Sequence, residues 1–185
     1  MKQAHSNVAI AIRQFEPKDR QAVIGIFREF MAELALESWR DAFNAYVQKA
    51  INEELMNIEH YYPLRNGAFW VADLCGAVIG MVGIEKAGPK TAELRRMAVK
   101  KSCRCVGVGS SLLKHVEGYC RDQGYERITL TTAELQIAAA RLYEKHGYQL
   151  MRKSKDVTAS HKNVGAGMAY LHYEKRLVTV ATNAR

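Results

Sequence analysis

The feature that most constrains this chain is the hexapeptide RCVGVG, which places two glycines one residue apart between a predicted strand and a predicted amphipathic helix. The strand spans residues 92–99, and the helix carries apolar side chains at helical spacing until Gly124 ends it. Glycine lets the backbone approach a ligand closely, and the N–H groups at a helix N-terminus attract anions. The pattern therefore predicts a phosphate-binding turn.

Spacing separates the known kinds of glycine loop. A dinucleotide-binding loop and a nucleoside-triphosphate loop would both need a further glycine at the position that Leu112 occupies. The pattern Gln/Arg-x-x-Gly-x-Gly/Ala fits at every fixed position and begins at Arg104, whose guanidinium could add a charge-assisted contact to an anion. The hexapeptide alone leaves a second interpretation open, a tight strand-to-helix turn with solvated basic side chains.

The remaining signals predict one α/β domain, and a length of 185 residues suits a single domain with a sizeable core. We expect a mixed, mostly antiparallel sheet of about seven strands flanked by four helices, with a core over about residues 8–176 and a tail over residues 177–185. The predicted strands cover residues 8–13, 68–73, 77–84, 92–99, 127–132, 149–153 and 168–175. The predicted helices cover residues 19–34, 43–58, 109–123 and 136–146.

Composition narrows the functional classes. A net charge of +8 favours anionic partners, but stacking aromatic side chains interleaved with basic ones are not evident, so we expect no nucleic-acid partner. No stretch reaches the roughly 18 apolar residues of a membrane span, and no secretory pattern is present, which predicts a cytoplasmic protein without a membrane span. The four cysteines and six histidines lack metal-ligand spacing, so we expect reduced thiols and no metal.

The hexapeptide is one part of a longer series of motifs over residues 93–148. A strand ending in Met97-Ala98-Val99 is followed by a basic link, the glycine loop, a helix, another strand and a helix that carries LYEKHGY from Leu142 to Tyr148. This series resembles the GNAT superfamily of acetyl-CoA-dependent N-acetyltransferases. Residues 121–132 and 136–143 are similar to its camello-type branch.

The resemblance implies an enzyme that moves the acetyl group of acetyl-CoA, its co-substrate, directly to a primary amine. Camello-type relatives acetylate lysines, or small amino acids and cysteine conjugates, and several carry a membrane segment that this chain does not show. We expect an amino acid or an amino-acid conjugate as acceptor. A protein lysine or N-terminal amine is the alternative acceptor. A non-catalytic module that only binds acyl-CoA is the alternative function. The sequence is compatible with a homodimer.

The family pattern also implies roles for single residues. Tyr143 is the candidate proton donor to the departing thiolate, since a phenol stays protonated at neutral pH; a tyrosine that only fills the core is the alternative. Gln136 is a candidate contact to the pantetheine arm, or simply a residue near the start of its helix. The backbone groups expected to meet the cofactor and the oxyanion belong to Met97, Ala98 and Val99. The cofactor loop comprises Arg104, Cys105, Val106, Gly107, Val108, Gly109 and Ser110.

The general base is the remaining assignment. An alkylammonium group, with a pKa of about 10.4, must lose a proton before it can attack a thioester. Glu93 is the first candidate and Glu85 the second, with solvated strand carboxylates as the alternative interpretation, and His161 and His172 are further candidates. We expect acceptor specificity to come from loops near residues 36–44 and 154–165. The second loop region is basic and would suit an amine that carries a carboxylate. Its basic residues are Arg152, Lys153, Lys155 and Lys162.

Overall fold

The computed structural model describes residues 10–156, 160, 162–165 and 167–177, and in them one seven-stranded sheet has the order β1-β2-β3-β4-β5-β7-β6. Neighbouring strands are antiparallel except β4 and β5, which are parallel. The expected mixed, mostly antiparallel sheet is confirmed. The strands are β1 (Ala11–Gln14), β2 (Ala68–Leu74), β3 (Ala77–Gly88), β4 (Thr91–Val99), β5 (Arg127–Ala133), β6 (Gln149–Asp156) and β7 (Met168–Arg176).

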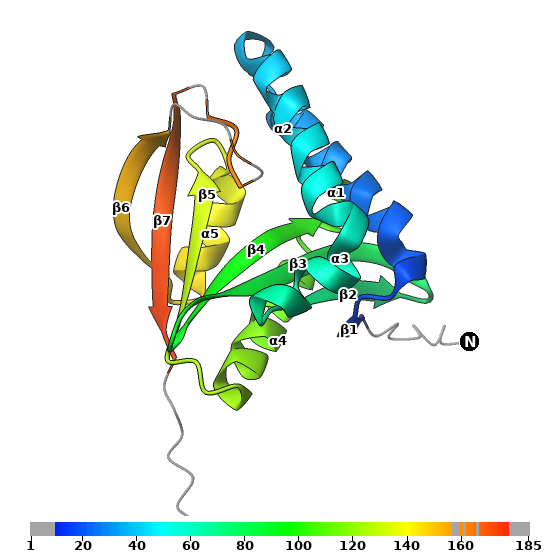
Figure 1. Ribbon diagram of the computed structural model, residues 1–185, viewed down its shortest axis with the longest axis vertical. Helices are drawn as coiled ribbons and strands as arrows, with labels where there is room; N and C mark the ends of the chain where they lie inside the picture. The colour runs from blue at the N-terminus through cyan, green and yellow to red at the C-terminus, as the bar shows by residue number, and fades with distance from the viewer. Residues whose placement is uncertain (1–9, 157–159, 161, 166, 178–185) are drawn as a thin grey trace, which may run out of the picture.

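Four longer helices and one short helix cover the two faces of this sheet in the described part of the chain. Helices α1 and α2 lie together over one face, whereas α4 lies on the opposite face (Figure 1). The helices are α1 (Arg20–Leu34), α2 (Arg40–Glu53), α3 (Ile58–Tyr61), α4 (Val108–Asp122) and α5 (Ile137–Lys145).

Both faces of the central strands are buried, and the period of two in β2 shows how. Phe69 and Val71 pack in the core under α1 and α2, while Trp70 and Ala72 pack in the core under α4. Successive side chains of a strand point to opposite faces, so a strand covered on both sides needs a continuous apolar run. The residues AFWVA at the start of β2 provide it.

Two expectations about local structure are wrong. The apolar periodicity over residues 43–58 predicts one helix, but the backbone breaks at Glu54 (φ −131°, ψ −63°) and continues as a 3₁₀ turn and α3. The carboxylate of Glu54 is fully buried and bound to Arg96, which fixes the chain at this point. The region near residues 36–44 is not a loop, because a 3₁₀ turn over Glu37–Trp39 leads directly into α2.

The feature that positions the site is the separation of β4 from β5. These parallel strands are paired from Thr91 with Arg127 to Leu94 with Leu130, and their pairing ends there. Farther along, β5 continues beside β7 while β4 turns toward α1, so the two strands diverge (Figure 1). The second half of β4, which includes residues 97–99, therefore has an unpaired edge on this side.

Candidate active site

A cavity of about 290 Å³ occupies the gap between the diverging strands β4 and β5. One wall comes from the α1 and α2 side of the sheet and includes Phe27, Phe43 and Tyr46. The other wall includes Tyr143 of α5 and Met97, which belong to the core on the α4 side. The cavity therefore connects the two faces of the sheet at the point where the strands separate.

A bulge in β4 shapes this cavity. Arg96 and Met97 together oppose the single β3 residue Val82, and Arg96 has a left-handed φ of 52°. An extra residue in a strand reverses the alternation of its side chains. Leu94 before the bulge and Met97 after it both face the α4 side of the sheet. The two residues between them, Arg95 and Arg96, therefore both face the side of α1 and α2, where they contact Glu54.

Tyr143 lies at the α5 end of the cavity. This residue is 5% exposed, and its ring packs against Tyr148 and Tyr173, with ring centroids 5.8 and 6.1 Å away. Among the described residues the partner of its hydroxyl is the thioether of Met97, at 4.0 Å, and a thioether is a weak acceptor. Burial raises the pKa of Tyr143 above its ordinary value, so the phenol is protonated and its O–H points toward a weak partner.

The glycine loop has the expected form. Gly107 has a φ of +93° and precedes the first turn of α4, and the first helical N–H with a backbone acceptor is that of Ser111, which donates to the carbonyl of Gly107. The preceding N–H groups, those of Val108, Gly109 and Ser110, lie before the hydrogen-bond ladder of the helix. They are the groups that an anion would meet at this end of α4.

Several loop side chains have structural partners. A Cβ on Gly109 would lie 3.0 Å from Leu142, so this glycine also lets α5 pack closely against α4. The Oγ of Ser110 is 2.9 Å from Nε2 of His146. The guanidinium of Arg104 donates to Glu33 at 2.6 Å and to the Val99 carbonyl at 3.0 Å, which ties the loop to α1 and β4. A phosphate contact from Arg104 stays a prediction.

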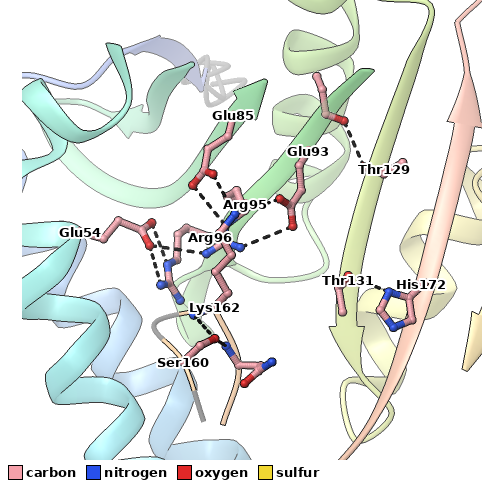
Figure 2. A network of polar contacts seen from close by, with 12 residues as sticks. Glu54, Glu85, Glu93, Arg95, Arg96, Thr129, Thr131, Ser160, Lys162 and His172 are labelled. Carbon is pink, nitrogen blue, oxygen red and sulfur yellow. Dashed lines mark hydrogen bonds and ion pairs between the residues drawn. The ribbon is translucent and has the colours of Figure 1, made fainter. Parts of the chain in front are cut away.

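Glu85 and Glu93 lie directly opposite each other on β3 and β4. Glu93 lines the cavity, whereas Glu85 is buried and accepts a hydrogen bond from the Tyr61 hydroxyl at 3.0 Å. The ammonium group of Lys162 contacts both carboxylates, at 2.9 Å from Glu85 and 3.2 Å from Glu93 (Figure 2). Among the four basic residues expected near the acceptor, Lys162 is thus the one that reaches the cavity.

Sequence reasoning missed the polar network under the cavity (Figure 2). Arg96 binds the carboxylate of Glu54 through two nitrogens at 2.6 and 2.9 Å, and the Tyr62 hydroxyl donates to the same carboxylate at 2.6 Å. Arg95 lies 3.5 to 3.7 Å from three carboxylates, those of Glu54, Glu85 and Glu93. Two signals could have found this network: consecutive arginines in a strand expected to be buried, and a charge on the apolar face of a helix.

The other candidates lie at the edge of the cavity. Gln136 lines it, but its side-chain oxygen accepts hydrogen bonds from Thr132 and from the N–H of Ala133, which holds the turn before α5. His172 also lines the cavity, with its two ring nitrogens 3.1 Å from Thr131 and 2.7 Å from Ser154. His161 lies outside the described residues.

The structure thus brings seven of the residues singled out in the sequence to one cavity. They are Glu93, Met97, Ala98, Gln136, Tyr143, Lys162 and His172, whereas Val99 and the loop Arg104–Ser110 lie outside the lining. The unpaired β4 edge, the N–H groups at the start of α4 and the cavity suit a ligand with an anionic end and a reactive end. In the described part of the chain, no group of three or more His, Cys, Asp and Glu side chains could hold a metal ion.

Two further findings concern the described residues as a whole. None of their helices combines the length and the apolar character needed to cross a membrane. The four cysteines are free thiols, and burial raises the pKa of the Cys120 thiol to about 12.

Comparison with known sequences identifies relatives of this chain. The sequence profile described as acetyltransferase (GNAT) family matches residues 28–148. A probable N-acetyltransferase camello of Xenopus tropicalis is 29% identical over 134 residues, which are 71% of this chain and 61% of that protein. N-acetyltransferase 8 of Rattus norvegicus is 33% identical over 69% of this chain and 60% of its own length. N-acetylaspartate synthetase of Danio rerio is 32% identical over 64% of this chain and 43% of its own length. The chain spans about half the length of these relatives, and the predicted camello-type resemblance is confirmed.

Solved structures show the same fold. An acetyltransferase of the GNAT family from Staphylococcus aureus Mu50 matches with a TM-score of 0.72 and 24% identity, covering 92% of this chain and 100% of that chain. The PaiA N-acetyltransferase of Thermoplasma acidophilum, solved in complex with coenzyme A, has a TM-score of 0.71 at 19% identity, covering 91% and 99%. At these identities the likeness establishes the fold.

Proposed function

Because the chain belongs to the acetyltransferase (GNAT) family, we propose that it transfers the acetyl group of acetyl-CoA directly to a primary amine. The observation that carries this proposal is the cavity through the β4–β5 gap. It has a protonated tyrosine on one side of the sheet and a carboxylate, that of Glu93, on the other. A thioester and an amine that enter from opposite faces would meet between these two groups.

The glycine loop would hold the pyrophosphate of the co-substrate. Three N–H groups at the start of α4 and the positive end of its helix dipole favour an anion there. From the loop, the unpaired edge of β4 leads into the cavity, so its N–H and C=O groups at residues 97–99 can bind the amides of the pantetheine arm. The same edge can place an N–H beside the thioester oxygen, where negative charge develops during the reaction.

Glu93 would accept the proton of the acceptor ammonium, directly or through a water molecule. It is the cavity carboxylate with 24% of its side chain exposed, whereas Glu85 is almost fully buried. A base in contact with both the cavity and solvent can pass its proton on after each cycle. Glu93 is therefore better placed for this role than Glu85.

Tyr143 would donate a proton or a hydrogen bond to the departing thiolate. In water a phenol with a pKa of about 10 is a weaker acid than a thiol with a pKa of about 8.5, so this transfer is not driven by the difference in pKa. Burial raises both values, as Cys120 shows for a thiol of this protein. What the site supplies is a neutral donor, held by two aromatic contacts at the place where charge develops.

For the acceptor we propose an amino acid or an amino-acid conjugate. The Arg95 guanidinium in the cavity wall could bind a carboxylate near the reacting amine, and one relative is named N-acetylaspartate synthetase. Because the relatives are longer than this chain, their acceptors do not transfer to it directly. A protein lysine or N-terminal amine is the alternative acceptor.

The test follows thiol release from acetyl-CoA with a panel of amino acids, cysteine conjugates and lysine peptides. We expect turnover with at least one amine, and a fall in kcat of about 100-fold or more in Tyr143→Phe, with acetyl-CoA affinity retained. The matched control is Tyr125→Phe, which removes a hydroxyl that donates to the Asn66 carbonyl away from the cavity. Acetyl-CoA binding without turnover on the whole panel would instead indicate a binding module, and failure to bind acetyl-CoA would exclude both.

A further inference from the structure

We propose that Glu85 and Glu93 form the subsite for the primary ammonium group of the acceptor, and that Lys162 occupies this subsite until an acceptor displaces it. The inference rests on the proposed function, because it names how the acceptor of that same site is held. Its ligand class is a primary aliphatic ammonium ion, and its occupant in the structure is the same chemical group supplied by the chain itself.

The first observation is the pairing of two carboxylates across the sheet. Glu85 and Glu93 are direct partners in the antiparallel ladder of β3 and β4, on the side of α1 and α2. Like charges at directly opposite positions destabilise a sheet. Burial makes the arrangement more costly, since Glu85 is only 4% exposed. The pair therefore needs cationic groups beside it.

The second observation is the charge balance of the cluster in Figure 2. Among the described residues, three carboxylates, those of Glu54, Glu85 and Glu93, face two guanidinium groups, those of Arg95 and Arg96. The strands and helices of the cluster therefore leave one negative charge without a partner. Lys162, from the segment before β7, supplies the missing positive charge. The site requires one cation, and an acceptor ammonium ion would satisfy it equally well.

The way in which Lys162 is presented suits an exchangeable occupant. The turn that carries it is anchored, because Ser160 Oγ accepts the N–H groups of Lys162 and Asn163, and the buried Tyr170 hydroxyl accepts the N–H of Val164. The Lys162 side chain itself is 38% exposed. Its exposed side chain can therefore move into solvent while the anchored turn stays in place, and the arriving ammonium ion replaces its charge beside Glu85 and Glu93.

The third observation is an unused donor in the same place. Nε of Arg95 is buried and has no hydrogen-bond acceptor among the described residues, since the carboxylate oxygen of Glu85 lies 3.7 Å away. Arg95 is 6% exposed and lines the cavity beside Glu93 and Lys162. An acceptor molecule with an oxygen next to its ammonium group could also accept a hydrogen bond from this N–H. The ammonium group of Lys162 has no acceptor atom and cannot do so.

The binding test uses n-butylammonium chloride, which is the lysine side chain cut at Cβ, and needs no acetyl transfer. We expect it to raise the Tm of Lys162→Ala more than that of the wild-type chain. The stabilisation by a ligand increases with the ratio of its concentration to its Kd, and the loss of the competing Lys162 lowers that Kd. Equal concentrations of n-butanol and of potassium chloride should not reproduce the shift. Lys162→Arg keeps the cation and should behave as the wild type does.

The kinetic test follows thiol release from acetyl-CoA with n-butylamine as acceptor. Loss of an exposed competitor should lower KM in Lys162→Ala about five-fold, which corresponds to about 1 kcal/mol, with kcat within about two-fold. Glu85→Gln, which keeps an acceptor for Tyr61 but removes a charge, should raise KM. The matched control is Lys90→Ala, which removes an exposed lysine paired with Glu126 outside the cavity.

The outcomes separate this inference from the proposed function. Turnover with an unchanged KM in Lys162→Ala, or equal Tm shifts in Lys162→Ala and wild type, overturns the ammonium subsite and leaves acetyl transfer intact. A Tm shift confined to Lys162→Ala without turnover by any variant supports the subsite and counts against the proposed transfer reaction. A larger KM in Lys162→Ala would show that Lys162 binds the acceptor, and would also overturn the inference.

Discussion

The buried carboxylate of Glu54 gives the sharpest quantitative prediction. It is fully buried and accepts hydrogen bonds from Arg96 and Tyr62, with Arg95 3.6 Å away. Glu54→Gln keeps the shape of the side chain but leaves two buried guanidinium groups with one counter-charge fewer. Removing one partner of a buried ion pair costs about 3–5 kcal/mol. Since 1 kcal/mol shifts the Tm of a domain of this size by about 2–4 °C, we expect a Tm lower by about 6–20 °C.

The assay is thermal and urea unfolding followed by circular dichroism. The control Glu134→Gln removes a carboxylate that pairs with Lys153 at 3.0 Å on the surface, and should change the free energy of unfolding by about 1 kcal/mol or less. The variants Glu54→Gln, Arg96→Gln and their combination form a double-mutant cycle, in which we expect the double variant to lose less than the sum. A loss below about 1 kcal/mol in Glu54→Gln, or a cycle without coupling, would refute the reasoning.

The same carboxylate predicts an acid limit. Burial opposes its ionisation, but the charge and hydrogen bonds of Arg96, together with the charge of Arg95, outweigh burial and hold the pKa of Glu54 below its ordinary value. A lowered folded-state pKa gives stability that is present above the unfolded pKa of about 4.3 and is lost as the pH falls through the folded value. The Tm of the wild type should therefore fall more steeply below about pH 4.3 than that of Glu54→Gln. Parallel declines would contradict this assignment.

Two further predictions concern the co-substrate side. Gly107→Ala forces alanine to a φ of +93°, which should lower the free energy of unfolding by about 1–2 kcal/mol and weaken acetyl-CoA binding in a titration. The control is Gly118→Ala in the middle of α4, where a Cβ meets open space. It should leave the free energy of unfolding unchanged or raise it. Because burial raises the pKa of Tyr143 above about 10, kcat should show no loss from its ionisation between pH 7 and about pH 10. A fall in kcat with a midpoint below pH 9 that Tyr143→Phe abolishes would show that the phenol ionises there.

The sequence predicts the parts of the fold whose signals are local. Gly107, Gly124 and Gly147 all have a left-handed φ, and each lies at a helix boundary that spacing alone indicates. The hairpin of β2 and β3 and the amphipathic pattern of α4 are likewise present in short stretches of sequence. The resemblance predicts a role for Tyr143, and the position of Glu93 on a strand near the expected acceptor site suggests a role for it. Both side chains line the cavity, and their roles stay predictions.

The rest depends on contacts between distant segments. Glu54 lies on the apolar face of its predicted helix, and what stabilises it there is an arginine 42 residues farther along the chain. The consecutive arginines in β4 are a signal of buried charge, but they do not reveal the bulge at Arg96, since a regular strand would have placed them on opposite faces. Lys162 contacts Glu85 across 77 residues. Periodicity describes each segment alone, so it cannot report a charge that is balanced by another segment.

The shared position of Arg95 leads to a last prediction. Its guanidinium lies 3.5 to 3.7 Å from three carboxylates, so its charge is divided between the buried network and the ammonium subsite. Glu54→Gln would leave Arg95 and Arg96 with Glu85 and Glu93 alone, and the cluster would then need no further cation. Glu54 does not touch the subsite, yet its substitution in Lys162→Ala should weaken n-butylammonium binding, measured as a smaller rise in Tm than in Lys162→Ala alone. An equal rise in both variants would show that the subsite depends on its two contacting carboxylates and not on the charge balance of the cluster.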